Sequence, residues 1–162
     1  MQIRSAETAG FCFGVERAVS LAEQTAKSCA SAVTLGPIIH NRHVVERFEA
    51  MGLREIARAE DAQPGQTVVV RAHGIPVSEQ QTLAARGAKL VDATCPFVKK
   101  IHVIARQAEE AGRHLLIIGT PTHPEVTAIA SYSSDAHVFQ TAEALESWLT
   151  EAPGRRDLPF CM

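Results

Sequence analysis

Short apolar runs alternate with longer amphipathic stretches along this chain, and this alternation constrains the fold more than any other feature of the sequence. Two of the runs are continuous, Val68-Val69-Val70 and Leu115-Leu116-Ile117-Ile118. Continuous apolar runs are typical of strands that are buried on both faces of a parallel sheet. Strands that alternate with helices predict small α/β domains with parallel sheets.

The same patterns locate the individual elements. Strands are expected before Gly10 and at residues 31–35, 67–71, 89–92, 114–118 and 137–139. Helices are expected at residues 15–28, 41–51, 78–86, 97–111, 124–132 and 142–149. Ser78 is expected to cap the third helix, and Gly52, Gly87 and Gly112 are expected to close helices. We place a domain boundary near Thr94, which gives a first α/β domain at residues 1–94 and a second at residues 95–162.

Composition and charge exclude several classes of protein. The 162 residues fit one ordinary domain or two small ones, and 46% of them are hydrophobic, which is enough for a core. The net charge is −2 and no basic stretch stands out, so nucleic-acid binding is not indicated. No apolar run approaches the roughly 20 residues of a membrane helix, and the first residues lack a signal pattern. We therefore expect a cytoplasmic protein without a nucleic-acid or membrane partner.

The cysteines are spaced for a metal, a cluster or catalysis rather than for a zinc ribbon. The four cysteines contain no CxxC pair, and spaced cysteines in a reducing compartment seldom form disulfides. Cys12 and Cys95 precede predicted helices, where the positive helix end favours a thiolate. Either residue could instead be a small buried hydrophobic side chain. Cys29, at the end of a predicted helix, is interpreted as structural.

Chemically active side chains gather at the carboxyl ends of the predicted strands, where ligands of α/β proteins bind. The candidates, each behind a predicted strand, are Cys12, His40, His73, Cys95, His123 and Glu125. Thiolates hold iron–sulfur clusters, and histidines beside helix N-termini can bind phosphate groups. The sequence therefore predicts a cluster site that faces an anion site. The remaining histidines are interpreted as structural or solvent-facing: His43, His102, His114 and His137.

Five short motifs follow one another along almost the whole chain: Gly10-Phe11-Cys12-Phe13-Gly14-Val15, Leu35-Gly36-Pro37-Ile38-Ile39-His40-Asn41, Arg71-Ala72-His73-Gly74, Asp92-Ala93-Thr94-Cys95-Pro96 and His123-Pro124-Glu125-Val126. In this order they resemble the motifs of the 4-hydroxy-3-methylbut-2-enyl diphosphate reductase family, the iron–sulfur enzymes of the non-mevalonate isoprenoid pathway. The resemblance implies three small α/β domains around a central [4Fe-4S] cluster. It implies Cys12 and Cys95 as cluster ligands, and Glu125 as the group that delivers protons. It also implies contacts to the diphosphate or hydroxyl end of the substrate from His40, His73 and His123.

The family reaction is the reductive dehydroxylation of an allylic diphosphate to isopentenyl and dimethylallyl diphosphate. The resemblance implies single-electron transfer from a ferredoxin- or flavodoxin-type donor. The family also has a third domain with a third cluster cysteine, and a threonine-rich motif would be expected just after Met162. Cys161 does not match the third cysteine position, so we do not expect it to bind the cluster. The resemblance therefore implies an incomplete chain with a labile cluster, which we expect to be inactive by itself.

Two other functions stay open at this point. The chain could be a non-enzymatic diphosphate-binding module that keeps His40, His73 and His123. It could also be a mononuclear zinc protein that uses Cys12, Cys95 and one histidine. In either case, a shortened second domain would expose apolar surface and an unpaired sheet edge, which predicts association with other chains or poor solubility.

Overall fold

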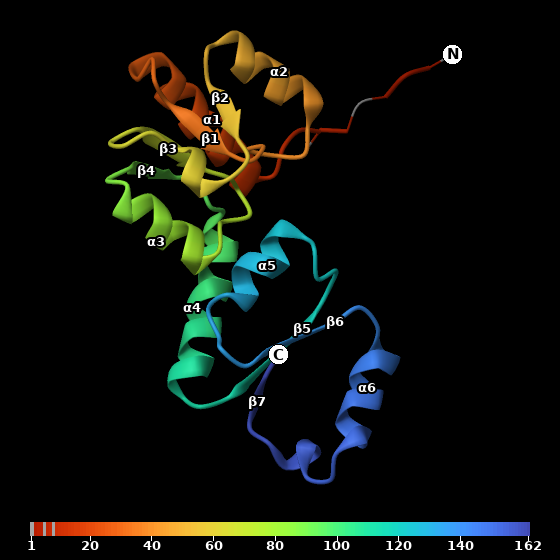
Figure 1. Ribbon diagram of the computed structural model, residues 1–162. Coiled ribbons are helices and arrows are strands. Elements are labelled where there is room, and N and C mark those ends of the chain that lie inside the picture. The colour runs from red at the N-terminus through yellow and green to blue at the C-terminus, as the bar shows by residue number, and fades with distance from the viewer. Residues whose placement is uncertain (1, 5, 8) are drawn as a thin grey trace.

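The computed structural model describes residues 2–4, 6–7 and 9–162, and its strands form two separate parallel sheets (Figure 1). The first sheet has the order β2-β1-β3-β4 and consists of β1 (Val33–Leu35), β2 (Arg54–Ile56), β3 (Thr67–Val70) and β4 (Lys89–Asp92). The second sheet has the order β6-β5-β7 and consists of β5 (His114–Ile118), β6 (Ala136–Phe139) and β7 (Phe160–Cys161). Each pair of neighbouring strands is parallel, as the sequence predicts.

Helices cover both faces of the first sheet. The first face packs against α1 (Phe13–Ser28) and α2 (Arg42–Ala50), and the second against α3 (Val77–Ala85) and the short helix η1 (Ala59–Asp61). Strand β3 contributes side chains to the cores on both faces of the sheet, because Val69 belongs to one core cluster while Val68 and Val70 belong to the other. Burial of each valine stabilises the fold by about 1.5–3 kcal/mol. The prediction that this strand is buried on both faces is confirmed.

The second sheet is smaller and less completely covered. One face packs against α4 (Pro96–Glu110) and α5 (Pro124–Ala130), and the other face lies against α6 (Ala142–Glu151), which leads through η2 (Arg155–Asp157) into β7. Strand β7 pairs only with His114 and Leu115 of β5. Among the described residues, the side of β5 that faces away from β6 therefore has no strand partner at residues 116–118.

All six predicted helices are present, and their observed ends lie within two residues of the predicted ones. Asn41 caps α2 through its side-chain oxygen, which accepts a hydrogen bond from the backbone N of Val44 at 3.3 Å. Gly52 and Gly112 follow α2 and α4 with φ angles of 86° and 63°, the left-handed conformation that ends helices. The prediction that Ser78 caps α3 is wrong. The helix begins one residue earlier at Val77, because Pro76, with φ −56° and ψ 152°, already supplies the non-helical backbone of a cap.

One strand was not predicted, and two predictions about strands are wrong. Strand β2 was not predicted, because its three residues form a polar edge strand without an apolar run. No strand precedes α1 in the described residues 2–4, 6–7 and 9–12, where the large apolar residue Ile3 is 83% exposed. The run of β5 is not buried along its whole length, since Ile118 is 50% exposed. The boundary near Thr94 falls between the two sheets and, as a domain boundary, stays a prediction.

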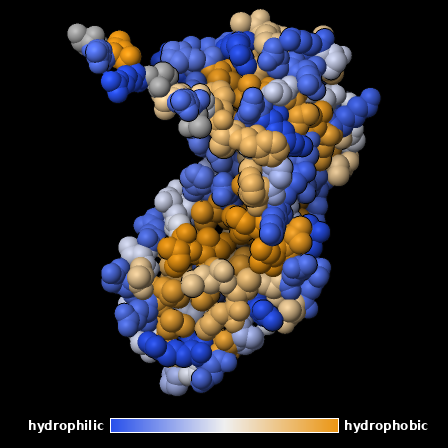
Figure 2. All heavy atoms as spheres, turned by 180° about the vertical axis from the view of Figure 1, so that it is seen from behind, coloured by the Kyte–Doolittle hydropathy of each residue, from blue (hydrophilic) through white to orange (hydrophobic). Residues whose placement is uncertain are grey.

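An apolar face lies on the half of the molecule that holds the second sheet. Figure 2 shows hydrophobic residues gathered over this half when the molecule is seen from behind. The face is formed by Ile101, Ile104, Ala105, Leu115, Leu116, Ile117, Ile118, Ile129, Cys161 and Met162. Within the part of the chain that the structure describes, no helix has both the length and the apolar character needed to cross a membrane.

Candidate functional site

Three histidines from both halves of the chain converge. His40 lies between β1 and α2, His73 follows β3, and His123 lies between β5 and α5. The ring centroids of His40 and His73 are 4.8 Å apart, and His123 lies 5.6 Å from His73 and 6.3 Å from His40. One nitrogen of each ring lies within 4.8 Å of the others. The three imidazoles that the sequence assigned to one anion site are thus within reach of one small ligand.

The topology of the first sheet explains two of these positions. Strands β1 and β3 are parallel neighbours, so the loops that follow them leave the same edge of the sheet. The backbone N of Ala72 donates to the carbonyl of Ile38 at 3.2 Å and joins the two loops. The Nε of Arg71 donates to the carbonyl of Gly74 at 3.2 Å, which holds the loop around His73 in a tight turn. Gly36, with φ 69°, passes so close to the Arg71 guanidinium that a Cβ would lie 2.8 Å from it.

His73 has the most unusual electrostatic environment of the three. Burial, and after it the positive charges of His40, Arg71 and His123, together lower the pKa of His73 from 6.5 to about 4. Its Nδ1 is buried without a hydrogen-bond partner among the described residues. A neutral imidazole with an uncommitted nitrogen can donate to or accept from a ligand that enters the site.

His123 is oriented by the helix that it begins. Its Nδ1 accepts a hydrogen bond from the backbone N of Glu125 at 3.2 Å. An Nδ1 that accepts leaves Nε2 as the nitrogen that carries the proton, so Nε2 can donate to an anion. Glu125 lies in the first turn of α5 and is partly buried. His123 and Glu125 therefore lie in one short segment at the start of α5.

The two candidate cluster cysteines occupy equivalent positions on two helices. Cys12 is the N-cap residue of α1 and Cys95 is the N-cap residue of α4, and neither sulfur makes a capping hydrogen bond. A Cβ added at Gly14 would collide with the sulfur of Cys95, so the first turn of α1 passes directly over that thiol. Arg17 donates to the carbonyl of Thr94 at 3.2 Å and strengthens this contact.

Backbone hydrogen bonds connect the cysteine region to the histidines. The N of Cys95 donates to the carbonyl of Ala72 at 2.9 Å, directly before His73 in sequence. Cys12 does not follow a strand, contrary to the expectation from the sequence, because no strand precedes α1 in the described residues. Cys12 nevertheless lies at the start of α1, and the first turn of this helix packs against Cys95.

The other two cysteines lie elsewhere. The thiol of Cys29 contacts the hydroxyl of Thr67 at 3.5 Å, a hydrogen bond that lowers the pKa of Cys29. Cys161 pairs in β7 with Leu115 and packs against the core of the second sheet. In the part of the chain that the structure describes, neither residue belongs to a group of three potential metal ligands.

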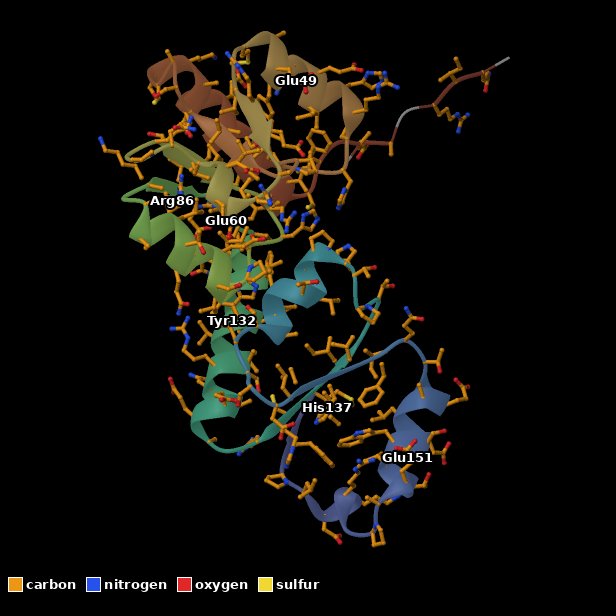
Figure 3. All side chains as sticks on the ribbon, viewed as in Figure 1. Glu49, Glu60, Arg86, Tyr132, His137 and Glu151 are labelled. Carbon is orange, nitrogen blue, oxygen red and sulfur yellow. The ribbon has the colours of Figure 1, made fainter. Side chains whose placement is uncertain are left out.

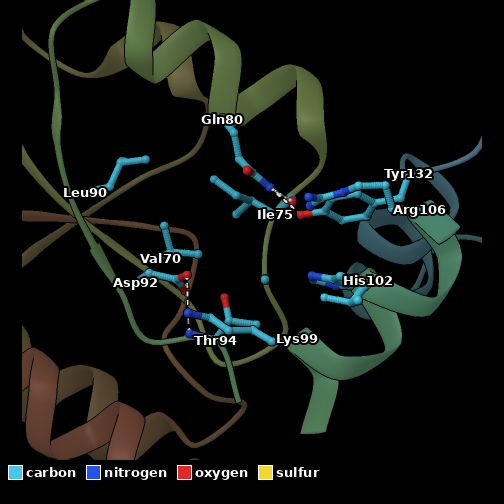
Figure 4. A pocket seen from close by; sticks show the side chains of 12 residues that line it. Val70, Ile75, Gln80, Leu90, Asp92, Thr94, Lys99, His102, Arg106 and Tyr132 are labelled. Carbon is cyan, nitrogen blue, oxygen red and sulfur yellow. Dashed lines mark hydrogen bonds and ion pairs between the residues drawn. The ribbon is translucent and has the colours of Figure 1, made fainter. Parts of the chain in front are cut away.

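The sequence did not indicate a cleft that is lined in part by Gly74, the residue after His73. It has a volume of about 270 Å³ and lies between the first sheet and α4 (Figure 4). His102 of α4 lines it, is only 6% exposed and stacks on Tyr132 at 4.7 Å. The Nε2 of Gln80 donates to the hydroxyl of Tyr132 at 2.9 Å and closes one end. The burial and stacking of His102 agree with its interpretation as structural.

Comparison with known proteins places these features in context. The sequence matches the family model described as LytB protein over residues 3–156. A 4-hydroxy-3-methylbut-2-enyl diphosphate reductase of Solidesulfovibrio magneticus is 44% identical over 153 residues, which cover 90% of this chain and 54% of that protein. A reductase of the same name from Aquifex aeolicus is 44% identical over 128 residues, which cover 78% of this chain and 44% of that protein.

Two solved structures of reductases have folds similar to that of this chain. A structure of (E)-4-hydroxy-3-methyl-but-2-enyl diphosphate reductase aligns with a TM-score of 0.73 at 40% identity and covers 87% of this chain and 53% of that one. The E-1-hydroxy-2-methyl-but-2-enyl-4-diphosphate reductase from Plasmodium falciparum aligns with a TM-score of 0.81 at 26% identity, over 86% and 45% of the two chains. The α/β fold class is confirmed. The chain spans about half the length of the curated relatives it matches.

Proposed function

This chain belongs to the LytB protein family, and from this membership we propose that it forms part of a 4-hydroxy-3-methylbut-2-enyl diphosphate reductase. The proposed reaction is the reductive dehydroxylation of the allylic diphosphate to isopentenyl and dimethylallyl diphosphate. Relatives that bear this name are 44% and 46% identical to the chain. The observation that carries the proposal is the convergence of His40, His73 and His123.

The three histidines fit the diphosphate end of such a substrate. A diphosphate is a compact polyanion, and imidazoles can meet it with hydrogen bonds and, when protonated, with charge. Nε2 of His123 is free to donate, and Nδ1 of His73 has no partner among the described residues. His40 directly precedes the cap of α2, where the positive end of the helix favours anions.

We propose Cys12 and Cys95 as two ligands of a [4Fe-4S] cluster. Both sulfurs are uncommitted at helix N-termini, which favour thiolates. Thiolate sulfur matches iron, and Gly14 keeps the space beside the Cys95 sulfur free of a side chain. When bound, such a cluster supplies single electrons and Lewis acidity to the allylic alcohol. A ferredoxin- or flavodoxin-type protein is the proposed source of the electrons.

Glu125 is the proposed proton donor. Loss of the hydroxyl group as water requires a proton at the leaving oxygen, and a positioned carboxyl group can supply it. Glu125 lies two residues after His123 in the first turn of α5, and its backbone N is bonded to that histidine. Glu125 therefore lies in the same helix start as one of the proposed substrate contacts.

A diphosphate-binding module is the second candidate function, because three histidines assemble within the described residues and could bind an anion without a cluster. We expect the 162 residues alone to bind diphosphate without turnover. A mononuclear zinc site of Cys12, Cys95 and one histidine is not favoured. In the described part of the chain, no group of three potential ligands includes either cysteine.

Calorimetric titration with inorganic diphosphate tests the proposal. We expect saturable binding that weakens by roughly 10-fold or more in His73→Ala, because a hydrogen bond to a charged group is worth about 1.5–3 kcal/mol. His43→Ala is the matched control, since the side chain of His43 is 93% exposed. Binding that is absent, or equally strong in both variants, would contradict the proposal.

Iron and sulfide analysis after anaerobic reconstitution separates the reductase from the binding module. The reductase is supported if Cys12→Ser and Cys95→Ser each lose bound iron and sulfide. The control variant Cys29→Ser should retain both. Diphosphate binding with no iron uptake in the unsubstituted chain would favour the module.

A further inference from the structure

A second cluster of potential metal ligands lies at the amino ends of β5 and β6, at the opposite end of β5 from His123. It consists of His114, Asp135 and His137, and one ligand atom of each lies within 4.8 Å of the others. Nδ1 of His114 contacts Oδ2 of Asp135, and Nε2 of His137 lies 2.7 Å from Oδ1 of the same carboxylate. Both imidazoles thus already face one carboxylate.

The register of the sheet brings these side chains together. Leu115 of β5 is paired with Ala136 of β6, so His114 and Asp135 precede paired residues on neighbouring strands. Asp135 lies in the turn directly before β6, and its contact with His137 puts both side chains on the same face of the sheet. This face lies against α6, and Figure 3 shows His137 between the sheet and that helix. The side chains of His114, Asp135 and His137 are 25%, 46% and 32% exposed, so an ion from solvent can reach them.

We propose that His114, Asp135 and His137 bind one divalent ion of the Zn²⁺, Co²⁺ and Ni²⁺ class. Two imidazoles and one carboxylate are a donor set that these ions prefer, and three protein ligands leave a position for water. Mg²⁺ and Ca²⁺ fit poorly, since they prefer a shell made of oxygen atoms. On binding, Asp135 exchanges its contacts with the two imidazoles for one bond to the ion, and all three ligands meet at the metal.

The fold around the cluster gives such an ion a structural role. The buried core of the second sheet consists of Ala105, Leu115 and Ile129, whereas the two core clusters of the first sheet are far larger. Helix α6 contributes no buried residue. Small cores commonly depend on a metal for stability. An ion here would join β5 to β6 and, through the contact of His137 with Trp148 at 4.6 Å, would also hold α6.

Trp148 provides a direct test, because it is the single tryptophan of the chain and lies against a proposed ligand. Co²⁺ is added to the tag-free chain while tryptophan fluorescence is recorded. We expect saturable quenching at one Co²⁺ per chain, since a paramagnetic ion next to an indole quenches its emission. Excess Zn²⁺, which has no unpaired electron, should displace Co²⁺ and restore the fluorescence. Zn²⁺ alone should raise the melting temperature.

Substitutions assign the effect to the cluster. Asp135→Asn and His114→Gln should each weaken Co²⁺ binding by roughly 100-fold or more, since loss of even an outer partner of a metal ligand costs 10–100-fold. His123→Gln, in the other histidine group, is the matched control and should leave the quenching unchanged. Circular dichroism shows whether each variant is folded. Absent quenching in the unsubstituted chain, quenching that survives in folded Asp135→Asn and His114→Gln, or quenching lost in His123→Gln alone, would overturn the proposal.

Discussion

His73 is the residue where burial and neighbouring charge act together. Partial burial penalises the imidazolium form, and His40, Arg71 and His123 repel a further positive charge, so the pKa of His73 is held at about 4. The ring is therefore neutral near pH 7, and its Nδ1 has no hydrogen-bond partner in the part of the chain that the structure describes. A bound polyanion would offset this repulsion and favour the protonated ring. The same arrangement that costs stability in the free protein thus prepares a binding site for an anion.

The depressed pKa of His73 predicts how stability depends on pH. The ordinary value is 6.5 and the folded value is about 4, so between these pH values the unfolded chain binds a proton that the folded chain does not. We expect the contribution of His73 to be intact above pH 6.5 and to be lost progressively as the pH falls toward 4. Urea unfolding at a series of pH values should show a shallower loss of stability in His73→Asn than in the unsubstituted chain. Parallel pH profiles for the two proteins would contradict the assignment.

At the scale of elements, the sequence predicted what depends on local pattern. Val68, Val69 and Val70 form a buried strand, as their continuous apolar run predicts. His40 and His73 could be grouped because loops after neighbouring parallel strands leave one edge of a sheet. His123 follows β5 of the second sheet, so its place beside them depends on how the two sheets are packed. Strand β2 was not predicted because it is short and mostly polar.

Other features depend on distances between elements, which the sequence does not specify. The His114, Asp135 and His137 cluster requires the register of β5 against β6. The cleft beside His102 requires the packing of α4 against the first sheet. Neither arrangement leaves a signal in a single stretch of sequence, so the sequence indicates only structural or solvent-facing roles for His102, His114 and His137.

The turn at Gly74 gives a prediction for the contact between β3 and α4. Gly74 has φ 77°, and a Cβ there would lie 2.6 Å from Cε1 of His102 and 3.3 Å from Cγ2 of Thr94. We expect Gly74→Ala to destabilise the protein by at least about 2 kcal/mol, because left-handed backbone strain and overpacking act together. Gly112→Ala is the matched control, with φ 63° and open space around the added methyl group, and should cost only about 1–2 kcal/mol. Chemical denaturation measures the free energy of unfolding of both variants. Equal losses of unfolding free energy would argue against the close contact between Gly74 and His102.

The two sheets of the molecule differ in how completely they are covered. Helices cover both faces of the first sheet, whereas the apolar face beside the second sheet is exposed to solvent. Ile101, Ile104 and Ile118 of this face are 41%, 42% and 50% exposed. Residues 116–118 of β5 also have an edge without a strand partner among the described residues. Exposed apolar surface beside an open sheet edge favours association between chains. This agrees with the association that the sequence analysis predicts.

We therefore expect the 162-residue chain to self-associate in a concentration-dependent way through the apolar face. Ile101→Glu should reduce the association, because burial of an unpaired carboxylate in an apolar contact is costly. Val103→Glu is the matched control. It lies on the same helix and is 47% exposed, but it lines the cleft beside His102 rather than the apolar face. Sedimentation velocity over a range of concentrations should show a smaller associated fraction for Ile101→Glu than for Val103→Glu. A monomer at every concentration, or equal association in both variants, would show that the apolar face does not mediate contacts between copies.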